Sequence, residues 1–144
     1  MAEEGHDDVS TFIPAYLIPG APAYLARTHP TVQETIAWIH EAGGVAVWAH
    51  PFWDLDSGDA VVAAIDRYVA AGLDGVECFY AAHDEHQTRL VHAACVERGL
   101  LTTGSADFHG PEHRIFSTFR DFGTYDLPVR LGPIAAGEAL AQGD

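Results

Sequence analysis

The sequence predicts an α/β domain built around parallel β-strands. Short apolar runs at residues 45–49, 75–79 and 100–103 have the composition of strands that are buried on both faces. Between these runs, apolar residues recur at helical spacing, so helices and strands alternate along the chain. Glycines follow each helical stretch just before the next strand begins. This alternation is typical of βαβ units, which assemble into a parallel sheet or barrel.

Composition divides the chain into three segments. Residues 1–21 contain Pro14 and Pro19 among aromatic side chains, which blocks a long helix and predicts an irregular or short extended N-terminal segment. Residues 22–134 carry the alternating pattern and form the predicted domain, whereas residues 135–144 have the small, polar composition of a C-terminal tail. A chain of 144 residues is long enough for one domain or for a piece of a larger one.

Three helices are expected between and before the strands. The first should begin at Thr31, because Thr31 and Glu34 have the spacing of a capping box, and it should end at the glycines of residues 43–44. The second is expected from an N-cap at Asp59 to about residue 71, and the third from about residue 84 to residue 98. Their buried faces are expected to contain Val32, Ile36, Ile39, Val62, Ile65, Val69, Leu90, Val91, Ala94 and Cys95.

Charge and hydropathy exclude several classes of function. Seven basic residues against 21 acidic ones give a net charge of −14, so the basic surface of a protein that binds duplex nucleic acid is missing. A phosphate ester held at a metal site is still compatible, because the ions supply local positive charge. No apolar run approaches the roughly 20 residues of a membrane helix, so no membrane partner is expected. The acidic N-terminus lacks the features of a signal peptide, which favours the cytoplasm.

The two cysteines lie in a predicted strand (Cys78) and in the third predicted helix (Cys95). Apolar neighbours surround both residues in the sequence, as is common for buried thiols. Since the other signals favour the cytoplasm, we expect reduced, buried thiols in preference to a disulfide.

The most informative pattern is the pair Asp107 and His109, which follows the last predicted strand. In extended backbone, residues two positions apart point the same way, so both side chains can face one site. Gly104 and Gly110 allow the tight backbone that such a site needs. Carboxylate oxygen and imidazole nitrogen are ligands of Zn, Mn or Fe, so the pair predicts part of a metal site.

Further polar residues lie at or after the ends of the other predicted strands, where α/β enzymes build their sites. His50 follows the first strand and is expected to be a metal ligand. Glu77 is expected to accept hydrogen bonds from loop backbone or an imidazole, or to point out of the sheet. His83 is expected to bind a phosphate or a metal, or to cap the following helix. The histidines expected to lie in loops or on solvated helix faces are His6, His29, His40, His86, His92 and His113.

Several of these residues belong to stretches that carry a family resemblance. The stretches are GGVAVWAHP at residues 43–51, LDGVE at 73–77, His83, and GSADFHG at 104–110. In this order they resemble the polymerase and histidinol phosphatase (PHP) domain over about residues 22–110. Within that family, the chain looks most like the stand-alone metal-dependent phosphoesterases related to nucleoside 3′,5′-bisphosphate phosphatases and 5′–3′ exoribonucleases.

The resemblance implies both a fold and a reaction. The fold would be the C-terminal part of a distorted seven-stranded β/α barrel, with two or three divalent ions in the complete site. His50, Asp107 and His109 would each bind a different ion, Asp107 and His83 would be catalytic, and Glu77 and His83 would contact substrate. The reaction would be hydrolysis of a phosphomonoester or nucleotide phosphate by metal-activated water. The expected substrate is a small phosphorylated molecule, such as a nucleotide or short oligonucleotide.

The sequence departs from the family pattern in two ways. The His-x-His strand and further ligands of the family's first half are absent, which predicts a chain that is weakly active or inactive alone. Phe52 and Trp53 stand after His50 and Pro51, where the family often has Gly-Arg, so a basic phosphate contact is lost or the loop is built differently. An unpaired sheet edge would favour self-association or pairing with a separate N-terminal half. The alternatives are a metal-dependent amidohydrolase and a non-catalytic remnant that acts as an interaction partner.

Overall fold

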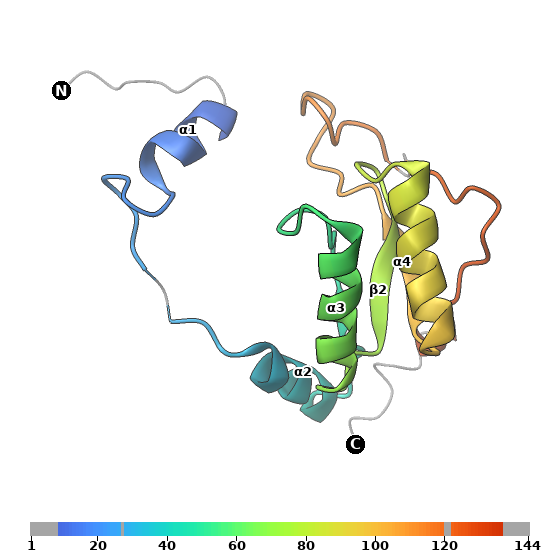
Figure 1. Ribbon diagram of the computed structural model, residues 1–144. Helices are drawn as coiled ribbons and strands as arrows, with labels where there is room; N and C mark the ends of the chain where they lie inside the picture. Colours follow the sequence, from blue (N-terminus) through green and yellow to red (C-terminus); the bar gives the residue numbers. More distant parts are fainter. Residues whose placement is uncertain (1–8, 27, 120–121, 137–144) are drawn as a thin grey trace. The chain divides into compact units, whose positions relative to one another are not determined.

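The computed structural model describes residues 9–26, 28–119 and 122–136. These residues belong to two compact units, and the boundary in the sequence falls between Pro30 and Thr31. The first unit contains helix α1 (Val9–Tyr16), with Pro14 inside it (Figure 1). The expectation of irregular or extended structure is therefore wrong for these residues. Pro14 removes one backbone donor, yet its fixed φ suits a helix, and Pro19 and Pro22 lie beyond Tyr16. The prolines therefore limit the helix to two turns without preventing it.

The second unit has the alternating order that the sequence predicts. Its elements are α2 (Val32–Glu41), β1 (Val47–Trp48), α3 (Gly58–Val69), β2 (Gly75–Tyr80), α4 (Glu85–Glu97), β3 (Leu101–Ser105) and α5 (Pro133–Ala136). The first strand is shorter than expected, and the predicted tail beyond Ala136 lies outside the described residues. Within the described part of the chain, every helix is too short or too polar to cross a membrane.

The three strands form one parallel sheet in the order β1-β2-β3. Val47 pairs with Gly75, and Gly75 pairs with Leu101, so β2 is the central strand. Helix α3 connects β1 to β2, and α4 connects β2 to β3, as in two successive βαβ units. The parallel α/β class is thus confirmed. Because all three strands run the same way, their carboxyl ends meet at a single edge of the sheet.

The helix starts follow local capping chemistry. Thr31 and Glu34 form the predicted capping box, with the Thr31 N–H donating to Glu34 Oε2 at 2.8 Å. The N-cap of α3 is Ser57, whose Oγ accepts the Ala60 N–H at 3.2 Å, so the prediction of Asp59 as the cap is wrong. Asp59 instead lies in the first turn, where its negative charge faces the helix N-terminus.

The core lies between α3, α4 and the central strand, which run alongside one another (Figure 1). Val61 and Ile65 of α3, Val76 of β2 and Val91 of α4 belong to one buried cluster. Val62 is half-buried at its margin, and Val32 is 41% exposed, so its predicted place in the core is wrong. The reason is that Val32 lies at the first turn of α2, while the core contact of this helix is made by Ile36.

The cysteines behave as the sequence predicts. Cys78 in β2 and Cys95 in α4 are buried free thiols, and their Sγ atoms lie 3.7 Å apart. Their contact and their burial raise the pKa of the Cys78 thiol, which keeps it protonated. Both side chains therefore act as small apolar residues in the core.

Burial predicts which valines support the fold. Val61→Ala removes two methyl groups from a side chain with no exposed surface and should lower the free energy of unfolding by about 2 kcal/mol. The same substitution at Val96, which is 46% exposed on α4, should change it by less than about 0.5 kcal/mol. Urea unfolding of the two variants measures the difference, and equal losses would contradict this core.

Candidate functional site

The carboxyl edge of the sheet brings residues from all three strands around Tyr80. Tyr80 is the last residue of β2, and its hydroxyl donates to Asp107 Oδ2, just beyond β3, at 3.0 Å. The His50 ring, just beyond β1, lies 5.6 Å from the Tyr80 ring, centroid to centroid. Burial and the Asp107 carboxylate raise the pKa of Tyr80, so its phenol stays a hydrogen-bond donor.

His50 is held by its backbone. Its φ of +33° is unusual for a residue with a side chain and requires support from its surroundings. Glu77 Oε2 accepts the His50 N–H at 2.7 Å, and the His50 carbonyl accepts the N–H of Trp53 at 2.9 Å. Of the alternatives left open for Glu77, the structure thus shows the contact with loop backbone. Burial raises the pKa of Glu77, while the bond from His50 opposes this shift.

Asp107 and His109 lie close together, although by a different route from the one expected. Asp107 has a φ of +49°, so the assumption of extended backbone is wrong here. The turn is stabilised by Ser105 Oγ, which accepts the Asp107 N–H at 2.8 Å. His109 Nδ1 lies 3.8 Å from Asp107 Oδ1 and hydrogen-bonds the Asp107 carbonyl. Because a carbonyl can accept but not donate, Nδ1 carries the hydrogen in this contact, and His109 Nε2 keeps its lone pair when the ring is neutral.

His83 is buried beside the same edge. Its Nδ1 donates to the Cys78 carbonyl at 3.2 Å, and its Nε2 is buried without a partner among the described residues. Its ring contacts those of Tyr80 and Phe52 at centroid distances of 5.2 and 5.3 Å. Burial lowers the pKa of His83, which favours the neutral ring. The N-cap of α4 is Asp84, so the alternative that His83 caps this helix is wrong.

The Cys78 carbonyl is available to His83 because β2 is irregular at this point. Glu77 pairs with Thr103 and Phe79 with Gly104, which leaves Cys78 as an extra residue in the central strand. A bulge of this kind locally disrupts the ladder and redirects the side chains that follow it. Tyr80, which contacts Asp107, lies just after this irregularity.

The structure adds two residues that the sequence analysis missed. Tyr80 is one, and the signal that could have found it is its position at the end of the central strand. His113 is the other, because its ring centroid lies 5.0 Å from that of His109. Gly110 and Pro111 separate the two histidines in the sequence, which is a turn signal that brings them together. His113 Nδ1 accepts the Phe116 N–H at 3.0 Å, so its hydrogen is on Nε2.

The remaining histidines have structural or exposed positions. His92 is buried in α4 with Nε2 near the Pro128 carbonyl at 3.0 Å, so its assignment to a solvated face is wrong. Pro128 belongs to the later chain, which pairs with β3 through Arg130 and Thr102, and the sequence pattern of one helix does not reveal this contact. His40 pairs with Asp74 at 2.8 Å, and His29 and His86 are exposed. His6 lies outside the described residues.

The expected metal ligands are brought to one edge but are not arranged as a finished site. Among the described residues, no group of three or more His, Cys, Asp or Glu side chains is placed to hold a metal ion. Asp107 and His109 form a close pair, and His50 is connected to it through Tyr80. The chemistry of this donor set, one carboxylate and imidazole nitrogens with free lone pairs, fits a divalent transition metal.

Comparison with known proteins finds two relatives in sequence. The chain is 34% identical over 131 residues to the 3′,5′-nucleoside bisphosphate phosphatase of Chromobacterium violaceum, covering 88% of this chain and 44% of that protein. It is 30% identical over 96 residues to the 5′–3′ exoribonuclease of Haemophilus influenzae, covering 67% of this chain and 35% of that protein. No family model matches the chain.

Two solved structures have a similar fold. One is an amidohydrolase from Chromobacterium violaceum with bound sulfate and no metal, with a TM-score of 0.61, 31% identity, and coverage of 75% of this chain and 38% of that one. The other is a protein from Bifidobacterium adolescentis that is described as a predicted metal-dependent phosphoesterase. Its TM-score is 0.66 and its sequence identity is 22%. It covers 94% of this chain and 45% of that one, and it supports the fold alone.

These findings confirm the resemblance. In sequence the chain is similar to one part of a PHP-type phosphoesterase, and the names of its relatives are those of hydrolases. The chain spans less than half the length of the relatives that it matches.

The buried His83 predicts a pH dependence of stability. The unfolded chain binds a proton at His83 near the usual pKa of about 6.5, whereas the folded chain binds it at a lower pH. Between these values the unfolded state holds more protons, so the free energy of unfolding rises with pH. Stability from this group is complete above about pH 6.5 and is lost as the pH falls through the folded pKa.

Urea unfolding at a series of pH values tests this assignment. His83→Gln should flatten the fall in stability on acidification, whereas His86→Gln, at an exposed position on α4, should preserve it. The same acid slope in both variants would show that His83 is not the buried group responsible.

Proposed function

We propose that this chain contributes the His50, Asp107 and His109 part of a metal-dependent phosphoesterase that hydrolyses phosphomonoesters or nucleotide phosphates. The observation that carries the proposal is the pair of Asp107 and His109, 3.8 Å apart and joined through Tyr80 to the end of β2. The names of the two relatives, a nucleoside bisphosphate phosphatase and an exoribonuclease, favour a phosphorylated nucleotide or short oligonucleotide as substrate.

The family pattern supports a ligand assignment. In our proposal His50, Asp107 and His109 each bind a different divalent ion of Mn, Zn or Fe, and two or three ions occupy the complete site. Such ions polarise phosphoryl oxygens and lower the pKa of water. The domain would be residues 22–134, as part of a seven-stranded barrel that is completed by a first half with a His-x-His strand.

The chain's own residues would support this chemistry in distinct ways. Glu77 positions His50 through the backbone N–H, and Tyr80 fixes one oxygen of Asp107, so that the other can face a ligand. We keep Glu77 and His83 as candidate substrate contacts. A neutral His83 with a lone pair on Nε2 can accept a proton, which suits activation of water.

His113 adds a hydrogen-bond donor to the proposed site. With Nδ1 occupied by backbone N–H groups, His113 presents its Nε2–H on an exposed ring beside His109. A phosphate oxygen could accept this hydrogen bond. His113 would then supply a polar contact in a site where Phe52 and Trp53 replace the Gly-Arg that often follows His-Pro in the family.

A metal-dependent amidohydrolase is the second candidate, favoured by the description of the structural neighbour from Chromobacterium violaceum. That class also places His and Asp at the ends of barrel strands, but the paired Asp107 and His109 favour the phosphoesterase. A third possibility is a non-catalytic remnant that binds a separate chain or a second copy. Each would act without duplex nucleic acid or membrane as partner, and we place the protein in the cytoplasm.

Metal content tests the ligand assignment. The purified chain should retain a measurable amount of Mn²⁺, up to about one equivalent, with no turnover of para-nitrophenyl phosphate, because three ligands are too few for a multinuclear site. Replacing Asp107 and His109 together by Ala should abolish Mn²⁺ retention, measured by elemental mass spectrometry after gel filtration. His86→Ala, at an exposed site on α4, is the matched control.

Three outcomes would change the proposal. Unchanged Mn²⁺ retention in the double variant would refute these ligands. About two or more equivalents with turnover would show that a complete site forms, across copies of the chain. Hydrolysis of amides but not of phosphate esters would favour the amidohydrolase.

A further inference from the structure

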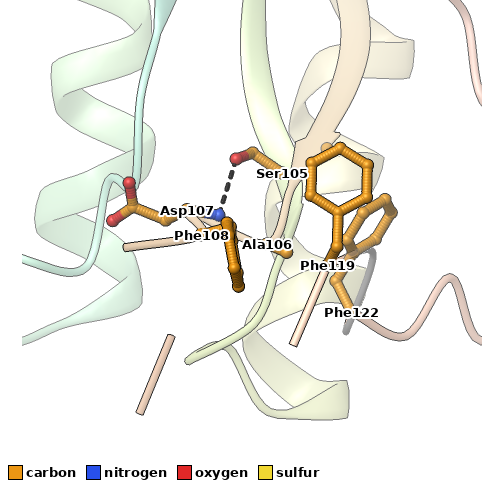
Figure 2. Close-up of a pocket in the computed structure, with 7 residues that line it drawn as sticks. Ser105, Ala106, Asp107, Phe108, Phe119 and Phe122 are labelled. Carbon is orange, nitrogen blue, oxygen red and sulfur yellow. Dashed lines mark hydrogen bonds between the residues drawn. The ribbon is translucent and has the colours of Figure 1, made fainter. Parts of the chain in front are cut away.

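A pocket of about 300 Å³ lies beside Asp107, on the side away from the carboxylate. It is lined by Gly104, Ser105, Ala106, Asp107, Phe108, Phe119 and Phe122. Figure 2 shows the Asp107 carboxylate pointing away from the phenylalanine rings, so the Asp107 backbone separates the pocket from the polar edge of the sheet. The volume is at the lower end of the range for small-molecule sites, about 300–1,000 Å³.

Three phenylalanine rings line the pocket. Phe119 is 73% exposed and Phe108 is 45% exposed, and their centroids lie 6.0 Å apart in an edge-to-face arrangement. Phe122 can pack over β3 because Gly104 lacks a side chain, since a Cβ there would lie 2.9 Å from Phe122 Cε2. Exposed rings that gather in one place can mark a binding surface.

Polar groups also line the pocket. Ser105 Oγ accepts the Asp107 N–H at 2.8 Å, which leaves its own hydrogen available to a ligand. Aromatic faces beside polar groups fit a planar heteroaromatic ring, because every nucleobase has a face that stacks on aromatic side chains and an edge that forms hydrogen bonds.

We propose that this pocket binds the nucleobase of the substrate, with Phe119 and Phe108 as stacking surfaces. The proposal rests on the proposed phosphoesterase function and narrows its substrate to phosphate esters that carry an aromatic base. Asp107 lines the pocket and also pairs with His109. A nucleotide with its base among the phenylalanine rings therefore has its phosphate beside Asp107 and His109. A sugar phosphate without a base would lose this contact.

The test uses adenosine, which has a base and no phosphate, so it requires neither the metal nor catalysis. The full 144-residue chain is titrated with adenosine in EDTA and followed by ¹H–¹⁵N NMR, with ribose as the ligand that lacks a base. Adenosine should shift the signals of residues 104–108, and ribose should not. Phe119→Leu should weaken adenosine binding about tenfold by removing a stacking face while keeping an apolar side chain.

Phe12→Leu is the matched control, because Phe12 is 39% exposed and belongs to the other unit of the chain. It should leave adenosine binding unchanged, and Phe108→Leu should weaken it as Phe119→Leu does. Absence of adenosine binding, or equal affinity in the Phe119 and Phe12 variants, would overturn the proposal. Loss of self-association in Phe119→Leu, without adenosine binding, would also overturn it and assign the rings to a protein interface.

Failure of this proposal can be separated from failure of the proposed function. Adenosine binding is measured without metal, whereas Mn²⁺ retention depends on Asp107 and His109. A chain that retains Mn²⁺ through those ligands but does not bind adenosine keeps its phosphoesterase assignment and loses the base pocket.

Discussion

Glu77 is a buried carboxylate in the central strand, and it accepts a hydrogen bond from the backbone N–H of His50. Burial of this carboxylate without a hydrogen-bond donor would cost free energy. This contact joins β2 to the turn that follows β1, and it accompanies the left-handed backbone of His50. Burial raises the pKa of Glu77, whereas the hydrogen bond from the His50 N–H lowers it by stabilising the ionised carboxylate. The position of the first candidate ligand therefore depends on the second strand.

The same dependence on neighbouring strands applies at the other end of the site. Tyr80 ends β2 and holds Asp107, which follows β3, so the central strand contacts the residues beyond both of its neighbours. The parallel sheet makes this possible because its two helical connections return each strand to the same starting edge. The bulge at Cys78 adds a carbonyl that fixes the ring of His83.

The backbone also fixes where each histidine carries its hydrogen. Carbonyl groups accept from Nδ1 of His83 and His109, which leaves a lone pair on Nε2 of the neutral ring. Backbone N–H groups donate to Nδ1 of His113, which leaves a donor at Nε2. In their neutral forms His83 and His109 thus have an acceptor at Nε2, which is buried in His83, and His113 has a donor there.

The sequence was sufficient for the elements whose signals are local. The capping box of Thr31 and Glu34, the alternation of helices and strands, and the clustering of polar residues after the strands all depend on nearby residues. The N-cap Ser57 was missed because Asp59 has an equally good cap side chain, and the choice depends on where the loop enters the helix. The helix at α1 was missed because proline lowers helix propensity without excluding a short helix.

The parallel α/β class and the polar residues at the carboxyl edge could be predicted from the sequence, because hydrophobic periodicity and the position of residues after each strand are local signals. The family resemblance came from the stretches around His50, Glu77 and Asp107. Three contacts could be known from the folded structure alone: the Glu77 carboxylate with the His50 N–H, the Tyr80 hydroxyl with Asp107, and the ring of His113 with that of His109. Each of these contacts depends on how strands pair and loops turn back in space. Such distances follow from packing and not from the order of residues along the chain.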